Sequence, residues 1–307
     1  MNNKIELRYT LIISILAILL SIFSFNIPLL GLLIPCLYAV LSTTNSKSIL
    51  IVLAINFLVM FNIDLKELVK FFMLNILPGI TVGIFVKRQT YDKNTDKLDP
   101  IYSSTILNMF YMIVLYLIFK SFFDLDLVKE FETMINDIVT LQFEIMKNSG
   151  FDISKESLSY VGDMIINLLP CMMFFEAIIL SCITYYLEMF LLSKIKYKNV
   201  SYPEFSKFSL PKNIITVYFS FYIIFLVMYL LKLDLYTELI AMNMQIIFNC
   251  LFTIQGVSVC IYYFIRWIKN KNIKRLIMLF LSLSLFGLVL VNLIGMIYSI
   301  RDFRKTA

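Results

Sequence analysis

Histidine is absent from the 307 residues. Its absence excludes catalysis by a histidine-based triad and removes both the commonest metal ligand and the usual proton carrier near neutral pH. The motifs His-Glu-x-x-His, Gly-x-Ser-x-Gly and the Walker loop are also missing. We therefore expect no enzymatic activity, no cofactor and no metal site.

Charge is scarce as well. Only 16% of the residues are charged, whereas a soluble domain has about a quarter, and 60% are hydrophobic. The mean hydropathy is +0.84. The windows Tyr9 to Phe25 and Leu276 to Ile300 contain no Asp, Glu, Lys or Arg. These observations indicate a protein whose solvent is the lipid bilayer, which we expect to be the bacterial plasma membrane.

Nine apolar windows follow one another along the chain, and the first is read as a retained helix because no Ala-x-Ala-like cleavage site closes it. The sequence therefore predicts an all-α fold, a polytopic membrane helix bundle with eight to nine transmembrane helices plus one external amphipathic helix, in a single integral membrane domain over 1–307. The first three windows reach only about 24 Å, less than a hydrocarbon core of about 30 Å, so one of them could fail to cross. The windows are 9–25, 27–42, 48–62, 67–86, 101–122, 161–193, 213–232, 236–266 and 275–299.

The basic residues predict the orientation. With a cytoplasmic N-terminus, 17 of the 27 Lys and Arg residues fall in loops on the inner side. The C-terminal residues Arg301, Arg304 and Lys305 would lie outside after nine spans and inside after eight, and both alternatives stay open. The basic residues lie in short clusters between apolar windows, so we expect no nucleic-acid partner.

The longest segment between windows, residues 121–162, is acidic and is predicted to be external. Val128, Phe131, Ile135, Ile138 and Ile145 recur within it at helical spacing. We expect an amphipathic helix over Leu125 to Lys147 that lies on the bilayer or on the bundle. It would be a connecting helix or, alternatively, a lid over an outward-facing pocket.

Polar side chains inside apolar windows are candidate site residues, because an unpartnered polar group is costly in lipid. Glu176 is the acid placed near the bilayer midplane, whereas Glu188 is predicted to pair with Lys194 or Lys196 near the interface. The amides could join Glu176 in an outward-facing pocket or could bind helix to helix. The candidate ligand-binding residues are Glu176, Asn75, Asn167, Gln245, Asn249 and Asn292.

Small residues and prolines predict close helix contacts and bends. Gly79 and Gly83 have the Gly-x-x-x-Gly spacing that lets two helices approach closely, and Pro170 should kink the helix that carries Glu176. In the first helix, Ala17 and Ser21 belong to a strip of small residues with Ser14 and Ser24, which predicts a helix-packing face.

The stretch Asn75-Ile-Leu-Pro-Gly-Ile-Thr-Val-Gly83, followed by Lys87-Arg88, and the C-terminal segment from Asn292 to Lys305 resemble the YybS-like family of bacterial multi-pass membrane proteins of unknown function. That family is distantly similar to the S components of energy-coupling-factor transporters, which capture vitamins or metal ions and pair with other membrane subunits. In those proteins an Ala-x-x-x-Ala contact lies on the first helix, where this chain has Ala17-Ile-Leu-Leu-Ser21.

The resemblance implies S-component-like small-molecule binding or transport, with the bilayer and other membrane subunits as partners and a small-molecule ligand of unknown identity. The alternative is a non-transporting structural or regulatory partner of envelope membrane proteins. The two differ in one respect: a transporter needs polar residues that converge on a cavity, whereas a scaffold can use its amides as isolated helix contacts.

Overall fold

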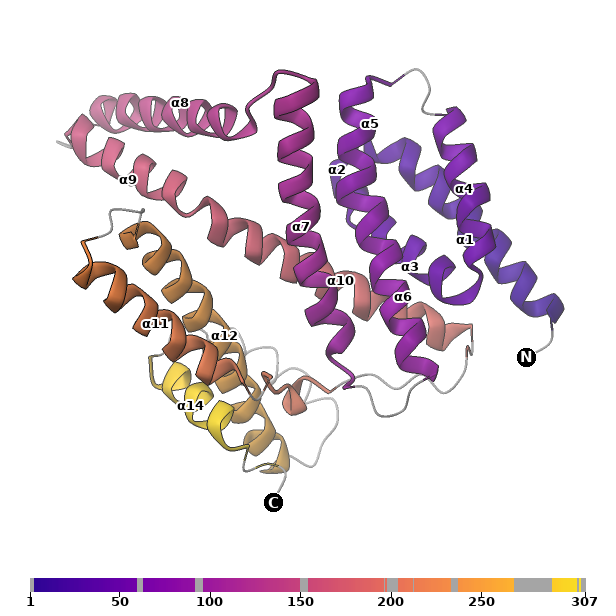
Figure 1. Ribbon diagram of the computed structural model, residues 1–307. Helices are drawn as coiled ribbons and strands as arrows, with labels where there is room; N and C mark the ends of the chain where they lie inside the picture. The colour runs from indigo at the N-terminus through magenta and orange to yellow at the C-terminus, as the bar shows by residue number, and fades with distance from the viewer. Residues whose placement is uncertain are drawn as a thin grey trace. The chain divides into compact units, whose positions relative to one another are not determined.

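A computed structural model of the chain describes residues 3–59, 63–91, 96–149, 154–195, 197, 204–211, 213–232, 237–267, 289–302 and 304. Every regular element among them is a helix, so the all-α prediction is confirmed (Figure 1). Contacts divide the chain into two compact units, Met1–Tyr202 and Pro203–Ala307, and each unit is described by itself.

Unit 1 begins with the four helices α1 (Asn3–Ser24), α2 (Pro28–Gly31), α3 (Ile34–Thr44) and α4 (Ser46–Val59). The predicted window 27–42 is thus divided between α2 and α3. With 11 residues, α3 is only about 16 Å long and cannot cross a bilayer by itself. Its residues 34 to 43 are all buried, because α1, α6 and α10 pack around it. Protein rather than lipid therefore surrounds α3.

The longest apolar helices of unit 1 come next. Helix α5 (Leu65–Phe71) continues through a π-helical turn, η1 (Phe72–Ile76), into α6 (Leu77–Tyr91), and α7 (Asp99–Phe122) follows. Together with α10 (Leu169–Lys194) and α12 (Thr237–Trp267) of unit 2, these make four helices in the described chain that are long and apolar enough to cross a membrane. Five shorter apolar helices accompany them, so the predicted number of eight to nine spans is not confirmed.

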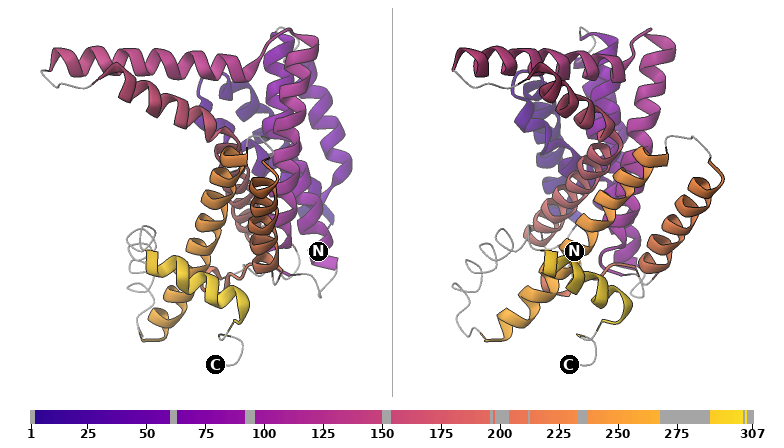
Figure 2. Two further views of the ribbon diagram at one scale, coloured as in Figure 1. Left: turned by 60° about the vertical axis from the view of Figure 1, so that its left-hand side comes forward. Right: turned by 90° about the vertical axis from the view of Figure 1, so that its left-hand side faces the viewer.

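The predicted amphipathic helix is present as α8 (Leu127–Asn148). It begins where it does because the Asp126 side chain accepts a hydrogen bond from the Val128 amide and so caps the helix. Helix α9 (Lys155–Asn167) folds back on α8, with Gly162 against Val139 and Ile135. The two helices form a hairpin that extends sideways from the end of α7 (Figures 1 and 2).

The kink expected at Pro170 is a break between two helices. Helix α9 ends at Asn167, and α10 begins at Leu169 with Pro170 in its first turn. Proline fits this position because the first amide groups of a helix have no partner within the helix.

Unit 2 contains the 3₁₀ turn η2 (Phe205–Lys207), α11 (Ile214–Leu230), α12 (Thr237–Trp267) and α14 (Val289–Ile300). Helices α12 and α14 cross closely because Gly256 lies against Val291 and Gly295 against Phe252, where any side chain would overlap backbone. The part of the predicted window 275–299 before residue 289 lies outside the described residues.

Candidate functional site: a buried polar stripe on α10

Three polar side chains line one buried face of α10. Ser181, Thr184 and Glu188 are three and four residues apart, so they lie one above another over about 10 Å of helix. Each is 0% exposed. Helices α3, α6 and α7 pack against α10 in this unit. The stripe is therefore enclosed by protein in a helix long enough to span the bilayer.

Glu188 has little compensation for its burial. The Thr43 hydroxyl of α3 hydrogen-bonds to Oε1, while Oε2 has no hydrogen-bond partner among the described residues. No described lysine or arginine acts on this carboxyl. The predicted pairing with Lys194 is wrong, because its ammonium group lies 5.3 Å from the centre of the Phe190 ring. Lys196 lies outside the described residues.

The Thr43 hydroxyl is shared among several acceptors. It lies 3.1 Å from the Ala39 carbonyl oxygen and 3.0 Å from that of Gly83, in addition to its contact with Glu188. A hydroxyl has only one proton to donate, so the three oxygens compete for it. A carboxyl held this weakly in a buried place needs either a proton or a bound cation.

Two glycines make this junction possible. A methyl group on Gly79 would overlap the backbone of Pro35, and one on Gly83 would overlap the backbone of Ala39. The Gly-x-x-x-Gly face of α6 therefore lies directly on α3. This close approach brings the Gly83 carbonyl within reach of Thr43.

The stripe continues away from Glu188 toward α7. Asn108 donates a hydrogen bond from Nδ2 to the Ser181 hydroxyl, at 2.9 Å. The Asn108 Oδ1 and the Thr184 hydroxyl have no partner among the described residues. Together with Glu188 Oε2, three buried oxygens of the stripe lack a partner. Oxygen atoms of this kind are ligands for protons or hard cations.

The sequence did not single out this stripe. Polar residues at i, i+3 and i+7 in an apolar helix are the signal that could have found it. Glu176 has a different environment: it is exposed on the surface of unit 1, and no hydrogen bond or ion pair of its own is found among the described residues. It points away from the face that buries Glu188.

The predicted amide cluster is distributed over both units. In unit 2 the Asn292 amide nitrogen donates to the Asn249 carbonyl oxygen at 2.9 Å, so these two residues join α14 to α12. Gln245 is exposed on α12. In unit 1, Asn75 is half-buried in the π-helical turn, and Asn167 is exposed at the end of α9. A pocket that joins Glu176 to the amides of unit 2 stays a prediction.

The small-residue strip of α1 faces the bundle. Ala17 and Ser21 are each 0% exposed, and α1 packs on α3. The Tyr38 hydroxyl of α3 hydrogen-bonds to Ser21 and accepts a hydrogen bond from Asn56 of α4. This strip therefore holds three helices of unit 1 together.

Arg304 is a second residue whose role the sequence did not reveal. It pairs through two nitrogens with Asp302, at 2.9 and 3.0 Å. Its other donors reach the Ser206 and Phe208 carbonyls and the Ser258 hydroxyl. All five N–H groups of the guanidinium are thus used. The C-terminal segment is thereby fastened to α12 and to the turn that precedes α11.

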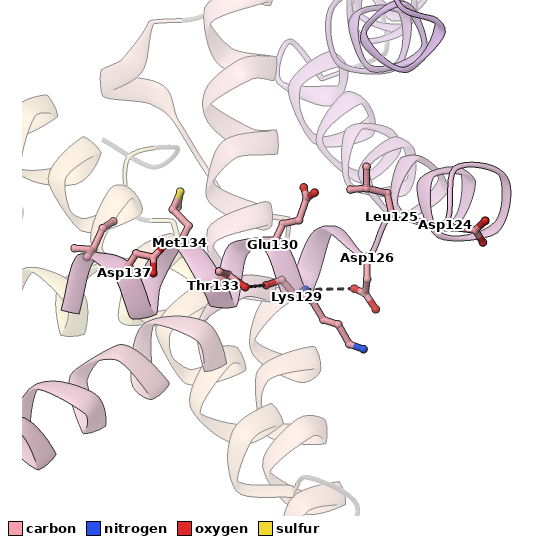
Figure 3. Close-up of a pocket in the computed structure, with 9 residues that line it drawn as sticks. Asp124, Leu125, Asp126, Lys129, Glu130, Thr133, Met134 and Asp137 are labelled. Atoms are coloured by element: carbon pink, nitrogen blue, oxygen red, sulfur yellow. Dashed lines mark hydrogen bonds between the residues drawn. The ribbon is translucent and has the colours of Figure 1, made fainter. Parts of the chain in front are cut away.

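An open groove of about 710 Å³ lies beside the start of α8 and is lined by residues between Asp124 and Ile138 (Figure 3). Burial alone would raise the pKa of Asp126. Hydrogen bonds from the Lys129 and Val128 amides and the charge of Lys120 outweigh that effect, so the pKa lies below its usual range. The described residues contain no cluster of three metal-ligating side chains. The groove is acidic, but its described residues do not form a metal-binding cluster.

The surface indicates the class of protein. Helix α11 buries none of its residues and exposes Ile223, Ile224 and Leu226. Apolar side chains along α4 and α7 are exposed as well. Surfaces this apolar, with long apolar helices, define a polytopic α-helical membrane protein. The chain belongs to the family described as "Predicted membrane protein (DUF2232)", which matches residues 11–297. No curated protein and no solved structure matches the chain.

Proposed function

We propose that this protein binds a small polar or cationic solute within the membrane as part of a transport process, in the manner of an S component. The observation that supports the proposal most is Glu188, a fully buried carboxyl with one oxygen unpartnered in the described chain. A bundle that serves only as a scaffold gains nothing from an uncompensated acid, because removing it would relieve a desolvation cost.

The site of this proposal differs from the one expected from sequence. Glu188 takes the place of Glu176 as the acid that needs a partner, because burial and not depth along the helix decides the cost of a charge. Thr184 and Asn108 contribute the neighbouring oxygens that a solute would contact. Helices α3 and α6 close the site on the side of Thr43.

Thermal unfolding of the full chain in lipid nanodiscs would test the proposal against a panel of inorganic cations, amines and water-soluble vitamins. A ligand at 100 times its dissociation constant stabilises the folded state by about 2.7 kcal/mol. We expect at least one compound to stabilise the native protein and to lose this effect with Glu188→Gln. Glu176→Gln is the matched control, because its carboxyl lies exposed on the same helix.

If no compound stabilises the protein, or if Glu188→Gln responds like the native chain, the proposal is rejected. The alternative, a structural or regulatory partner of envelope membrane proteins, is supported by unit 2. There Asn249 and Asn292 bind helix to helix, which is the use of amides that a scaffold makes.

A further inference from the structure

Most buried serine and threonine hydroxyls described in unit 1 bond to a backbone carbonyl, usually of their own helix. Ser181 bonds to the carbonyl four residues earlier at 2.8 Å, and Thr105 and Thr43 do the same in their own helices. This is the usual way in which a hydroxyl is satisfied inside an apolar helix. The Thr184 hydroxyl makes no such bond and has no partner among the described residues, although it is 0% exposed.

Thr184 and Glu188 are one turn apart on the same buried face of α10. Their unpartnered atoms, the hydroxyl oxygen and Oε2, are both hard oxygen ligands. A third oxygen of this kind, Oδ1 of Asn108, lies farther along the stripe beside Ser181. A proton on Glu188 would remove its charge, whereas a cation would bind the charged carboxylate and the hydroxyl oxygen together.

The charge of the site selects among cations. Glu188 supplies one negative charge, and no described lysine or arginine acts on it. The charge of Glu188 acts on the ionisable groups of Cys36 and Tyr185, and neither of these residues is a cation. A monovalent ion would leave the buried site neutral, whereas a divalent ion would leave one uncompensated positive charge.

We propose that Glu188 and Thr184 form a binding site for one monovalent alkali cation inside unit 1. This inference rests on the proposed function and deepens it, because it names an ion that would accompany the solute. Glu188 provides the carboxylate and Thr184 the hydroxyl oxygen, while the Thr43 hydroxyl holds the other carboxylate oxygen, Oε1.

The test compares thermal unfolding of the full chain in phosphatidylcholine nanodiscs in NaCl, KCl and choline chloride at equal ionic strength. We expect NaCl or KCl to raise the melting temperature with one-site saturation, and MgCl₂ to have no such effect. Thr184→Val, which replaces the hydroxyl with a methyl group of similar size, should weaken the ion's affinity by about tenfold or more. Glu188→Gln should abolish the effect, and the control Glu176→Gln should preserve it.

Infrared difference spectroscopy of the native chain, with Na⁺ or K⁺ against choline, gives a readout that does not require a variant to fold. A change in the carboxylate stretching band that disappears only with Glu188→Gln supports the site. A carboxyl band that neither ion alters, a larger stabilisation by Mg²⁺, or an equal response from Glu188→Gln overturns it.

The two proposals can fail separately. If neither Na⁺ nor K⁺ acts through Glu188 but an amine or vitamin does, the cation site is rejected and the proposed function stands. If the cation effect is found but no solute of the panel stabilises the protein, the site stands and the proposed solute-binding function is rejected.

Discussion

The contact between α3 and α6 provides the sharpest test of how the site is built. In Gly83→Ala, the new methyl carbon would lie 2.6 Å from the Ser42 Cβ and 3.0 Å from the Ala39 carbonyl carbon, and closer still to the Ala39 oxygen. Carbon atoms in contact are about 3.5–4.0 Å apart, so the two helices must separate by about 1 Å. A change of rotamer cannot relieve the overlap, because the Ala39 atoms belong to the backbone.

Overpacking of this kind costs about 1–3 kcal/mol of unfolding free energy. Separation of the helices would also move the Gly83 carbonyl away from the Thr43 hydroxyl, which now lies 3.0 Å from it. We therefore expect Gly83→Ala to lower the melting temperature, by about 2–4 °C for each kcal/mol. Thermal unfolding in nanodiscs measures this directly, and the reaction of buried Cys36 with a thiol reagent reports the opening of α3.

Gly31→Ala is the matched control in the same unit. A methyl group there would meet only the Asn75 side-chain oxygen, at the ordinary contact distance of 3.5 Å. This variant should unfold like the native chain. If Gly83→Ala also unfolds like the native chain and Cys36 reacts no faster, the close contact and the junction built on it are refuted.

Arg304→Lys should destabilise unit 2 by about 2–4 kcal/mol, because lysine cannot replace the five N–H contacts of the guanidinium and leaves buried acceptors unpaired. Limited proteolysis should then cleave the segment before α11 faster than in the native chain. The control Arg301→Lys, at an exposed position, should have little effect. Asp137→Cys on exposed α8 should react with an impermeant maleimide in intact cells while Lys207→Cys is protected; the reverse pattern would invert the predicted topology. Because the pKa of Asp126 is lowered in the folded protein, its carboxylate stabilises α8 fully at pH values above the ordinary pKa of aspartate, and this stabilisation is lost as the pH falls through the folded-state pKa. The rate of hydrogen exchange at the start of α8, corrected for its intrinsic pH dependence, should therefore rise in acid. Asp126→Asn should remove this pH dependence.

Local signals in the sequence predicted several elements well. The helical spacing of apolar residues placed the start of α8 within two residues of its observed position beside the capping Asp126, and Pro170 marked the boundary between α9 and α10. Capping and proline effects act within one helical turn, so they can be read from neighbouring residues. The Gly-x-x-x-Gly spacing indicated a close contact but did not name α3 as the partner.

The acidic residues of α10 show where sequence reasoning failed. Depth along the helix favoured Glu176, but depth does not say which way a side chain points. The separation of 12 positions between Glu176 and Glu188 places the two side chains about 120° apart around the helix axis. Apart from the polar stripe of Ser181, Thr184 and Glu188, the sequence of α10 has no amphipathic pattern that distinguishes the face packed against protein from the face that carries Glu176.

The sequence by itself determined that this is an all-α membrane protein with an amphipathic helix between apolar ones, because hydropathy and helical period are properties of consecutive residues. Only the tertiary structure decided which polar groups are buried and what they meet. Thr43 and Glu188 are 145 positions apart, and Arg304 reaches a carbonyl 98 positions earlier. The cost of a buried charge depends on such distant partners, and they become neighbours only when the helices pack.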